Sequence, residues 1–252
     1  MRALPTAFAL LFLLFAHTTL AGTPSPALAQ EADRLFRQGN EAFARGETAA
    51  AIGAYAKVLA LGVESPELNY DLGTAYLKEN RTGLATLYLL RSHRAAPRDP
   101  AIRQNLALAV RESRASVPDA PWYRDLLGRL SAAEWRSAAV GFYWLAVLML
   151  AVILAGRFRR PAAVLLAVSA AGLLVSVAGI RSWNGSESHA LAVVVSRGQQ
   201  GYLAPTAASR TISLSEGSQV RIRETAQGWL RVEASEGTAW VPAEAVERVL
   251  PD

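Results

Sequence analysis

Side chains that could perform acid–base, nucleophilic or metal chemistry are few and scattered along this sequence. There is no cysteine, which excludes disulfides, thiolate catalysis and cysteine-ligated metals. Beyond the N-terminal segment, the histidines are His93 and His189, and two long apolar stretches separate them. The sequence contains no HExxH, no G-x-S-x-G and no phosphate-binding loop, and its acidic residues form no recognisable catalytic pair. We therefore expect no enzymatic activity, no metal site and no cofactor.

The composition suits a membrane protein with water-exposed parts. Of the 252 residues, 52% are hydrophobic and 19% are charged, which is apolar for a soluble protein. The net charge of +5 comes almost entirely from arginines, which are scattered rather than arranged in a basic stripe interleaved with aromatic residues. Nucleic acid is therefore not expected as a partner.

Residues 1–29 read as a signal peptide. Arg2 is followed by AFALLFLLFA, an apolar stretch of about ten residues that is too short to cross a hydrocarbon layer of about 30 Å. Two patterns of small residues suitable for cleavage follow, at TLA and at ALA, the second ending at Ala29. We expect an exported chain that starts near Gln30; an uncleaved membrane anchor is the alternative.

Two uncharged stretches of 19 residues each, Ala138–Gly156 and Ala162–Ile180, are long enough to cross a bilayer as helices. Buried helices of a soluble protein are the alternative, but the remaining chain is too small to surround both. The second stretch carries Gly172, Ser176 and Gly179 on one helix face, where small side chains favour close contact between helices. An Ala/Gly-rich helix without a specific partner would show the same pattern.

The short connection at residues 157–161 carries Arg157, Arg159 and Arg160. Positive charge is retained on the cytoplasmic side of membranes, so these residues predict a helical hairpin with a cytoplasmic tip. Aromatic residues at the opposite end of the hairpin, Trp135 and Trp183 among them, mark the other interface. Together with the signal peptide, this places both chain ends in the non-cytoplasmic compartment.

An internal repeat of 34 residues organises residues 30–115. It relates Gly39 to Gly73 and Ala51 to Ala85, and it continues to Ala107 in a third, incomplete copy. We expect the small residues where the two helices of a pair approach each other. An apolar stripe supplies the core between the helices, formed by Leu35, Tyr55, Leu72, Tyr76 and Leu89.

These positions resemble the tetratricopeptide repeat, above all LGTAY with Ala85 and Pro97; Gln38 and Ala42 depart from the pattern in the first copy. The resemblance implies a concave groove, in which Asn40 would hold the backbone of a bound peptide. Packing against a capping helix or the membrane-proximal segment is the alternative use of these side chains. The predicted groove residues are Phe36, Asn40, Phe43, Tyr70, Thr74 and Lys78.

Residues 116–137 form a linker or an interfacial helix. Pro118 and Pro121 interrupt the preceding helix, and Ser131 with Glu134 predicts a capping box at the start of the next one. The apolar residues between them would suit a helix lying on the membrane surface. A loop with one helical turn is the alternative.

Residues 189–250 alternate apolar and polar side chains between glycine-containing turns, which predicts five short strands and a small barrel. The strings LSEGSQVRI, GWLRV and GTAWVP resemble the bacterial SH3 domain. Such domains bind peptides or the peptide part of the cell wall. Tyr202, Trp229 and Trp240 are the predicted binding aromatics; for the two tryptophans, packing inside the barrel is the alternative.

The sequence thus predicts a multidomain membrane protein: an all-α tetratricopeptide-repeat domain, a two-helix transmembrane hairpin and an all-β SH3-like barrel. This order resembles the BatE-type proteins of bacterial aerotolerance (Bat) operons, and the NLALA stretch after RDPAIRQ adds to the resemblance. It implies a scaffold in the bacterial inner membrane with both soluble domains in the periplasm. The implied partners are membrane proteins with von Willebrand A domains and, indirectly, a MoxR-type ATPase. A tether that binds peptidoglycan is the alternative function.

Overall fold

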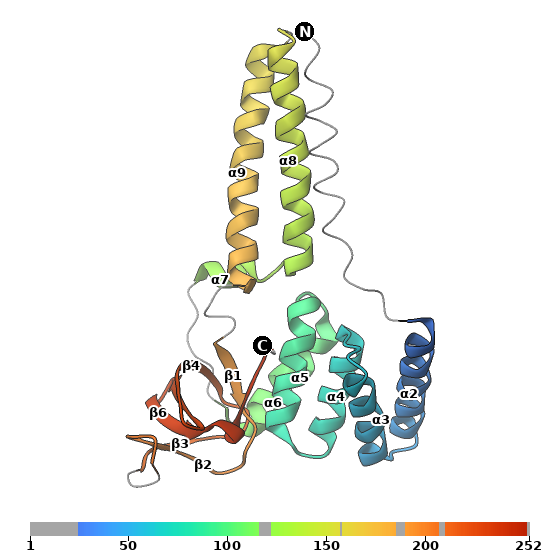
Figure 1. Cartoon of the computed structure of the whole chain (residues 1–252), viewed down its shortest axis with the longest axis vertical. Helices are drawn as coiled ribbons and strands as arrows, with labels where there is room; N and C mark the ends of the chain where they lie inside the picture. The colour runs from blue at the N-terminus through green and yellow to red at the C-terminus, as the bar shows by residue number, and fades with distance from the viewer. Residues whose placement is uncertain (1–24, 116–121, 157, 185–189, 207–209, 251–252) are drawn as a thin grey trace.

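The computed structural model describes residues 25–115, 122–156, 158–184, 190–206 and 210–250. A group of paired helices and a curled antiparallel sheet lie beside each other at one end of a long two-helix hairpin (Figure 1). The chain is therefore a mixed helical and β protein with two long apolar helices.

The N-terminal part consists of short helices in sequence order. They are α2 (Pro26–Ala44), α3 (Thr48–Ala60), α4 (Pro66–Lys78), α5 (Thr82–Ala95) and α6 (Pro100–Ser113). Helices α2, α4 and α6 each begin with a proline behind a side-chain cap, supplied by Ser25, Ser65 and Asp99. Helix α2 starts before the expected boundary at Gln30, because the hydroxyl of Ser25 accepts a hydrogen bond from the N–H of Leu28.

The predicted close approaches within the helix pairs are present. A Cβ atom added to Gly39 would lie 2.4 Å from the ring of Tyr55, and one added to Gly73 would lie 2.6 Å from the side chain of Leu89. Ala51 and Ala85 are fully buried, as the repeat predicts. The same 34-residue offset thus relates the side chains of one helix contact to those of the next.

Ala107 is the exception to this prediction, because it is exposed. Its counterparts Gly39 and Gly73 are covered by the second helix of their pair. Helix α6 ends at Ser113, and no later helix of the described residues pairs with it as a second helix. The neighbouring Ala109 is buried instead, because α6 packs its inner face against the preceding pair.

The hairpin consists of α8 (Ala132–Leu154) and α9 (Arg159–Asn184). Both helices are long and apolar enough to cross a membrane. In the most apolar 18-residue segment of each helix, no residue of α8 is buried inside the protein, and 17% of the residues of α9 are buried. At 1.5 Å per residue, α8 is about 34 Å long. Arg159 and Arg160 are exposed in the first turn of α9 rather than in the connection, and Arg157 lies outside the described residues.

Small residues of α9 form its contact with α8. A Cβ atom on Gly172 would lie 2.5 Å from the ring of Phe142, and one on Gly179 would lie 2.3 Å from the indole of Trp135. Ser176 between them is fully buried, and its hydroxyl donates to the carbonyl of Gly172. The predicted small-residue face is therefore the packing face of the hairpin.

The base of the hairpin is held by hydrogen bonds from two indoles. Trp135 donates to the carbonyl of Leu127 at 2.9 Å, and Trp183 donates to that of Leu130 at 2.8 Å. The expected capping box of Ser131 and Glu134 starts α8. Ahead of it, Trp122–Leu127 form the short helix α7.

The C-terminal part is an antiparallel sheet in the order β3-β2-β6-β5-β4-β1-β7. Its strands are β1 (Leu191–Val194), β2 (Gln199–Tyr202), β3 (Arg210–Leu214), β4 (Gln219–Ala226), β5 (Trp229–Ala234), β6 (Gly237–Pro242) and β7 (Val246–Arg248). The sequence predicts five strands, whereas the described residues form seven. The short strands β2 and β7 lack the alternation on which the prediction rests.

The helices and the sheet share a small core that the sequence does not reveal. Leu87 and Leu90 of α5 pack against Val193 of β1 and against Val249, all of them buried. At Gly83, at the start of α5, an added Cβ atom would lie 2.6 Å from the carbonyl oxygen of Val194. The two parts are therefore in direct contact rather than connected only through the hairpin.

Candidate functional site

The six predicted groove residues lie on the helices that come first in each pair. Phe36, Asn40 and Phe43 belong to α2, and Tyr70, Thr74 and Lys78 belong to α4. The ammonium of Lys78 lies 3.9 Å from the ring centroid of Phe43, so the two sets meet across one face. The structure thus brings α2 and α4 together as the repeat predicts.

Helix α6 completes this face through a residue that the prediction missed. Nδ2 of Asn105 donates hydrogen bonds to Oγ1 of Thr74 at 3.0 Å and to the hydroxyl of Tyr70 at 3.2 Å. Asn105 lies 34 residues after Asp71, so the repeat offset would have identified both positions as equivalent. These bonds orient the polar side chains of α4 on the face.

A cavity of about 370 Å³ opens between α2, α4 and the start of α6. We call it the repeat groove, and Phe36, Asn40 and Tyr70 are the predicted residues that line it. The prediction missed several others, which are Pro66, Glu67, Asp71, Ala96, Asp99, Ala101 and Ile102. Thr74, Phe43 and Lys78 lie on the same helices outside this lining.

The repeat groove is acidic as well as aromatic. Glu67, Asp71 and Asp99 line it, and among the described residues no lysine or arginine does. Burial, with a smaller contribution from the charge of Glu67, raises the pKa of Asp71 to about 6. No ion pair to Asp71 occurs among the described residues. A cation bound beside Asp71 would favour the ionised carboxylate. The rings of Phe36 and Tyr70 line the same cavity.

Asn40 is positioned by the core beneath it. Its Oδ1 accepts a hydrogen bond of 2.8 Å from the hydroxyl of Tyr55, whose ring packs on Gly39 and contacts Phe36 at a centroid distance of 5.8 Å. Asn40 is exposed, and its Nδ2 donor has no partner among the described residues. This arrangement suits a hydrogen bond to a peptide carbonyl.

A second surface gathers the three predicted aromatic residues of the sheet. Tyr202 of β2 is paired in register with Trp240 of β6, and its ring meets that of Trp229 of β5 edge-on, with 5.5 Å between centroids. We call this set the aromatic shelf. All three side chains are half-buried, on the sheet face opposite the core residues Leu230 and Val241.

No family model matches this chain, and no curated protein matches it either. What the chain binds is therefore inferred from the geometry of the repeat groove and of the aromatic shelf.

Metal ligands do not gather anywhere in the described ranges: no three His, Asp or Glu side chains there are placed to hold an ion. His93 is half-buried in α5, and burial, with the nearby charge of Arg103, lowers its pKa. Its Nδ1 has no hydrogen-bond partner in the described part of the chain. His189 lies outside the described residues.

Proposed function

We propose that this protein is a non-enzymatic, membrane-anchored scaffold whose extracytoplasmic modules recruit protein partners. The helical module would be of the tetratricopeptide-repeat type and the sheet an SH3-like barrel. The repeated contacts Gly39–Tyr55 and Gly73–Leu89 support the first assignment. The glycine turns at Gly217 and Gly228 and the antiparallel β4–β5–β6 meander support the second.

The proposed location is the bacterial inner membrane, with α8 and α9 crossing it. Both folded parts adjoin the same end of the hairpin (Figure 1), so insertion of the hairpin would leave both on one side. The arginines at the opposite tip favour the cytoplasm for that tip, and the signal-peptide-like N-terminus favours export of the folded parts.

The observation that carries the binding function is the repeat groove. It combines an acidic lining with the rings of Phe36 and Tyr70 and with an amide donor on Asn40. These groups suit an extended protein segment that inserts a lysine or arginine side chain beside Asp71. The resemblance to BatE-type proteins suggests as partner a membrane protein with a von Willebrand A domain, with a MoxR-type ATPase further along the same complex.

Site-specific photo-cross-linking tests this proposal in the full chain in its own membrane. A photoreactive residue at Asn40 or Tyr70, which both line the repeat groove, should capture a von Willebrand A-domain protein, identified by mass spectrometry. The same group at Lys57, exposed on α3 outside the groove, is the matched control. Equal capture from Lys57, or a chain that purifies alone in mild detergent, would count against the proposal.

A second candidate function rests on the aromatic shelf. Aromatic rings gathered on one face of a sheet suit the sugar and peptide parts of peptidoglycan, and Tyr202, Trp229 and Trp240 provide three such rings. In this case the full chain in detergent should sediment with purified sacculi, and Trp240→Ala should abolish sedimentation. Thr225→Ala, exposed on β4, should leave it unchanged. Absence of sedimentation by the unaltered chain would exclude the tether.

A further inference from the structure

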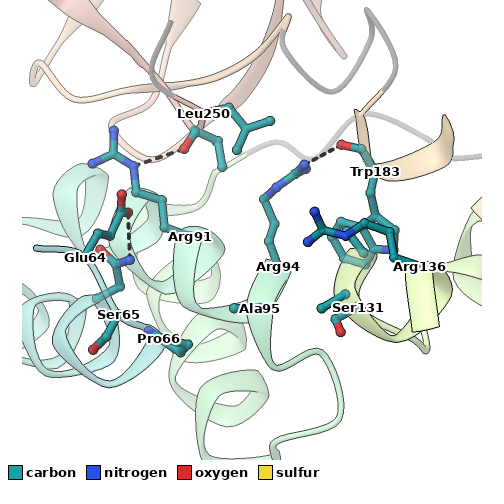
Figure 2. A pocket seen from close by; sticks show the side chains of 14 residues that line it. Glu64, Ser65, Pro66, Arg91, Arg94, Ala95, Ser131, Arg136, Trp183 and Leu250 are labelled. Atoms are coloured by element: carbon teal, nitrogen blue, oxygen red, sulfur yellow. Dashed lines mark hydrogen bonds between the residues drawn. The ribbon is translucent and has the colours of Figure 1, made fainter. Parts of the chain in front are cut away.

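A second cavity, of about 430 Å³, lies where the helices, the sheet and the base of the hairpin meet. Its walls come from the start of α4, the last turn of α5, the first turns of α8, the end of α9 and the residues after β7. Figure 2 shows Glu64 and Arg91 on one side of this pocket and Trp183 with Arg136 on the other, with Arg94 between them. We call it the hairpin-base pocket.

The pocket is rich in arginine, but not every arginine in it is available to a ligand. Arg91 donates to the carbonyls of Val249 and Arg248 and pairs with Glu247, so its Nε and Nη2 already hold the sheet on α5. Among the described lining residues, Glu64 provides the one carboxylate of the pocket, and it accepts a hydrogen bond from Asn69. Glu64 lies on the side of the pocket opposite Trp183. Arg94 and Arg136 remain.

Arg94 is a largely enclosed cation that has no counter-ion among the described residues. Its guanidinium lies 5.0 Å from the ring of Trp183 and donates to the carbonyl of that residue. Burial lowers its pKa, and no carboxylate pairs with it in the described part of the chain. An enclosed charge is stabilised by an anion in its vicinity, and the pocket beside Arg94 has room for one.

Arg136 supplies a second guanidinium to the same pocket. It lies in the second turn of α8, is exposed, and has no ion pair among the described residues. Two guanidinium groups facing one cavity offer several N–H donors to a single group, an arrangement that matches the oxygens of a phosphate.

The position of the pocket along the hairpin indicates where this phosphate comes from. Arg136 lies two residues before the uncharged stretch that starts at Ala138, and Trp183 lies three residues after Ile180. At 1.5 Å per residue these distances are about 3 and 5 Å, which is within the headgroup layer of about 5–8 Å on each side of the hydrocarbon. Indole rings favour the same layer.

We propose that the hairpin-base pocket binds the phosphate of a membrane phospholipid headgroup through Arg94 and Arg136, with the Trp183 ring beneath it. Bound there, the lipid joins the end of α5 to the base of the hairpin. The helical module would then have a fixed orientation relative to the membrane surface. This inference rests on the membrane insertion of α8 and α9 in the proposed function, and it is independent of what binds in the repeat groove.

Native mass spectrometry of the delipidated full chain in detergent, titrated with phosphatidylglycerol, tests the proposal. We expect one retained lipid, and Arg136→Gln should weaken its retention about tenfold; Arg94→Gln should do so as well. Arg181→Gln is the matched control, because Arg181 is an exposed arginine at similar depth that does not line the pocket. Equal weakening by Arg181→Gln would overturn the proposal, since the binding would then follow overall charge alone.

Further measurements distinguish a lipid from free phosphate and a lost binding site from a misfolded variant. Inorganic phosphate that displaces the lipid at millimolar concentration, or binds as tightly by itself, would overturn the assignment to a lipid. Arg136 is exposed, so its replacement should leave the thermal unfolding of the lipid-free chain unchanged. If Arg136→Gln fails to fold, Arg136→Lys takes its place, with the same expected weakening of lipid retention.

Flotation with liposomes tests insertion separately. A chain that does not float contradicts the membrane proposal, whereas a chain that floats without retaining a lipid contradicts only this inference.

Discussion

The backbone N–H of Gly83, at the start of α5, donates a hydrogen bond of 2.9 Å to Oε1 of Glu216, 133 positions further along the chain. The other oxygen of Glu216 accepts from Nε of Arg197 at 3.0 Å, and Arg197 also donates to the carbonyl of Asn80. One carboxylate in the β3–β4 loop thus links the α4–α5 turn to the sheet. The repeat groove and the aromatic shelf therefore belong to one connected body.

Replacement of Glu216 tests this link. Glu216→Ala leaves the N–H of Gly83 without its partner and Arg197 without its ion pair, so we expect a loss of about 1–3 kcal/mol in the free energy of unfolding. Glu236→Ala, in the exposed turn between β5 and β6, should change it little. Urea unfolding of the full chain in detergent measures both. Identical midpoints for the two variants would show that the link contributes nothing.

Two glycines in the first helix pair should respond in opposite directions to alanine. Gly39→Ala places a methyl group 2.4 Å from the Tyr55 ring, so repacking should destabilise the protein by about 1–3 kcal/mol. Gly53 in α3 has no neighbour within 4 Å of an added Cβ atom, so Gly53→Ala should stabilise the helix by about 0.5–1 kcal/mol. Thermal unfolding followed by circular dichroism measures the difference. Equal shifts in the same direction would contradict the packing described for α2 and α3.

Asp71 should make stability depend on pH in an unusual direction for a carboxylate. Its pKa is raised to about 6 from an ordinary value of 3.8, so the folded state holds a proton that the unfolded state has released. Between about pH 4 and 6, the contribution of this residue to stability is therefore lost as the pH rises. Asp71→Asn should remove that loss. The free energy of unfolding of the variant, relative to that of the unaltered chain, should therefore increase with pH up to about 6 and then stay constant.

Urea unfolding at a series of pH values measures this difference, with Asp33→Asn, an exposed position on α2, as control. If the difference in free energy of unfolding between Asp71→Asn and the unaltered chain does not change with pH, the prediction is wrong. A bound cationic segment should remove the penalty on the ionised carboxylate, so partner binding should strengthen as the pH rises through 6.

The hairpin offers a matched pair within the apolar helices. Gly179→Val would drive a side chain into the indole of Trp135, which an added Cβ atom already approaches to 2.3 Å, whereas Gly141 has no neighbour within 4 Å. We expect Gly179→Val to destabilise the hairpin by about 1–3 kcal/mol and Gly141→Val to leave it unchanged. Tryptophan fluorescence during thermal unfolding in detergent follows the change. A destabilising Gly141→Val together with a neutral Gly179→Val would mean that α8 and α9 pack through other faces.

Part of the repeat groove could be predicted from the sequence because its pattern is local. The offset from Gly39 to Gly73 places equivalent residues on equivalent helix faces, and the predicted Phe36, Asn40 and Tyr70 line the cavity. Ala107 follows the same offset but is exposed, because the offset says nothing about whether a second helix is present to cover it. Asp71 was overlooked because a carboxylate on a helix is usually solvated; its raised pKa depends on the burial around it.

The sequence by itself determined the order of the parts, the helices and their caps, and the small-residue face of α9. It also determined which strands of the sheet carry the aromatic residues. Each of these depends on side chains at helical or strand spacing, which are close in the sequence. Only the tertiary structure decided that α5 packs on β1, that Glu216 reaches Gly83 and that Arg94 meets Trp183 at the base of the hairpin. These contacts join residues far apart in the chain, and they depend on the shapes of surfaces that exist only after each part has folded.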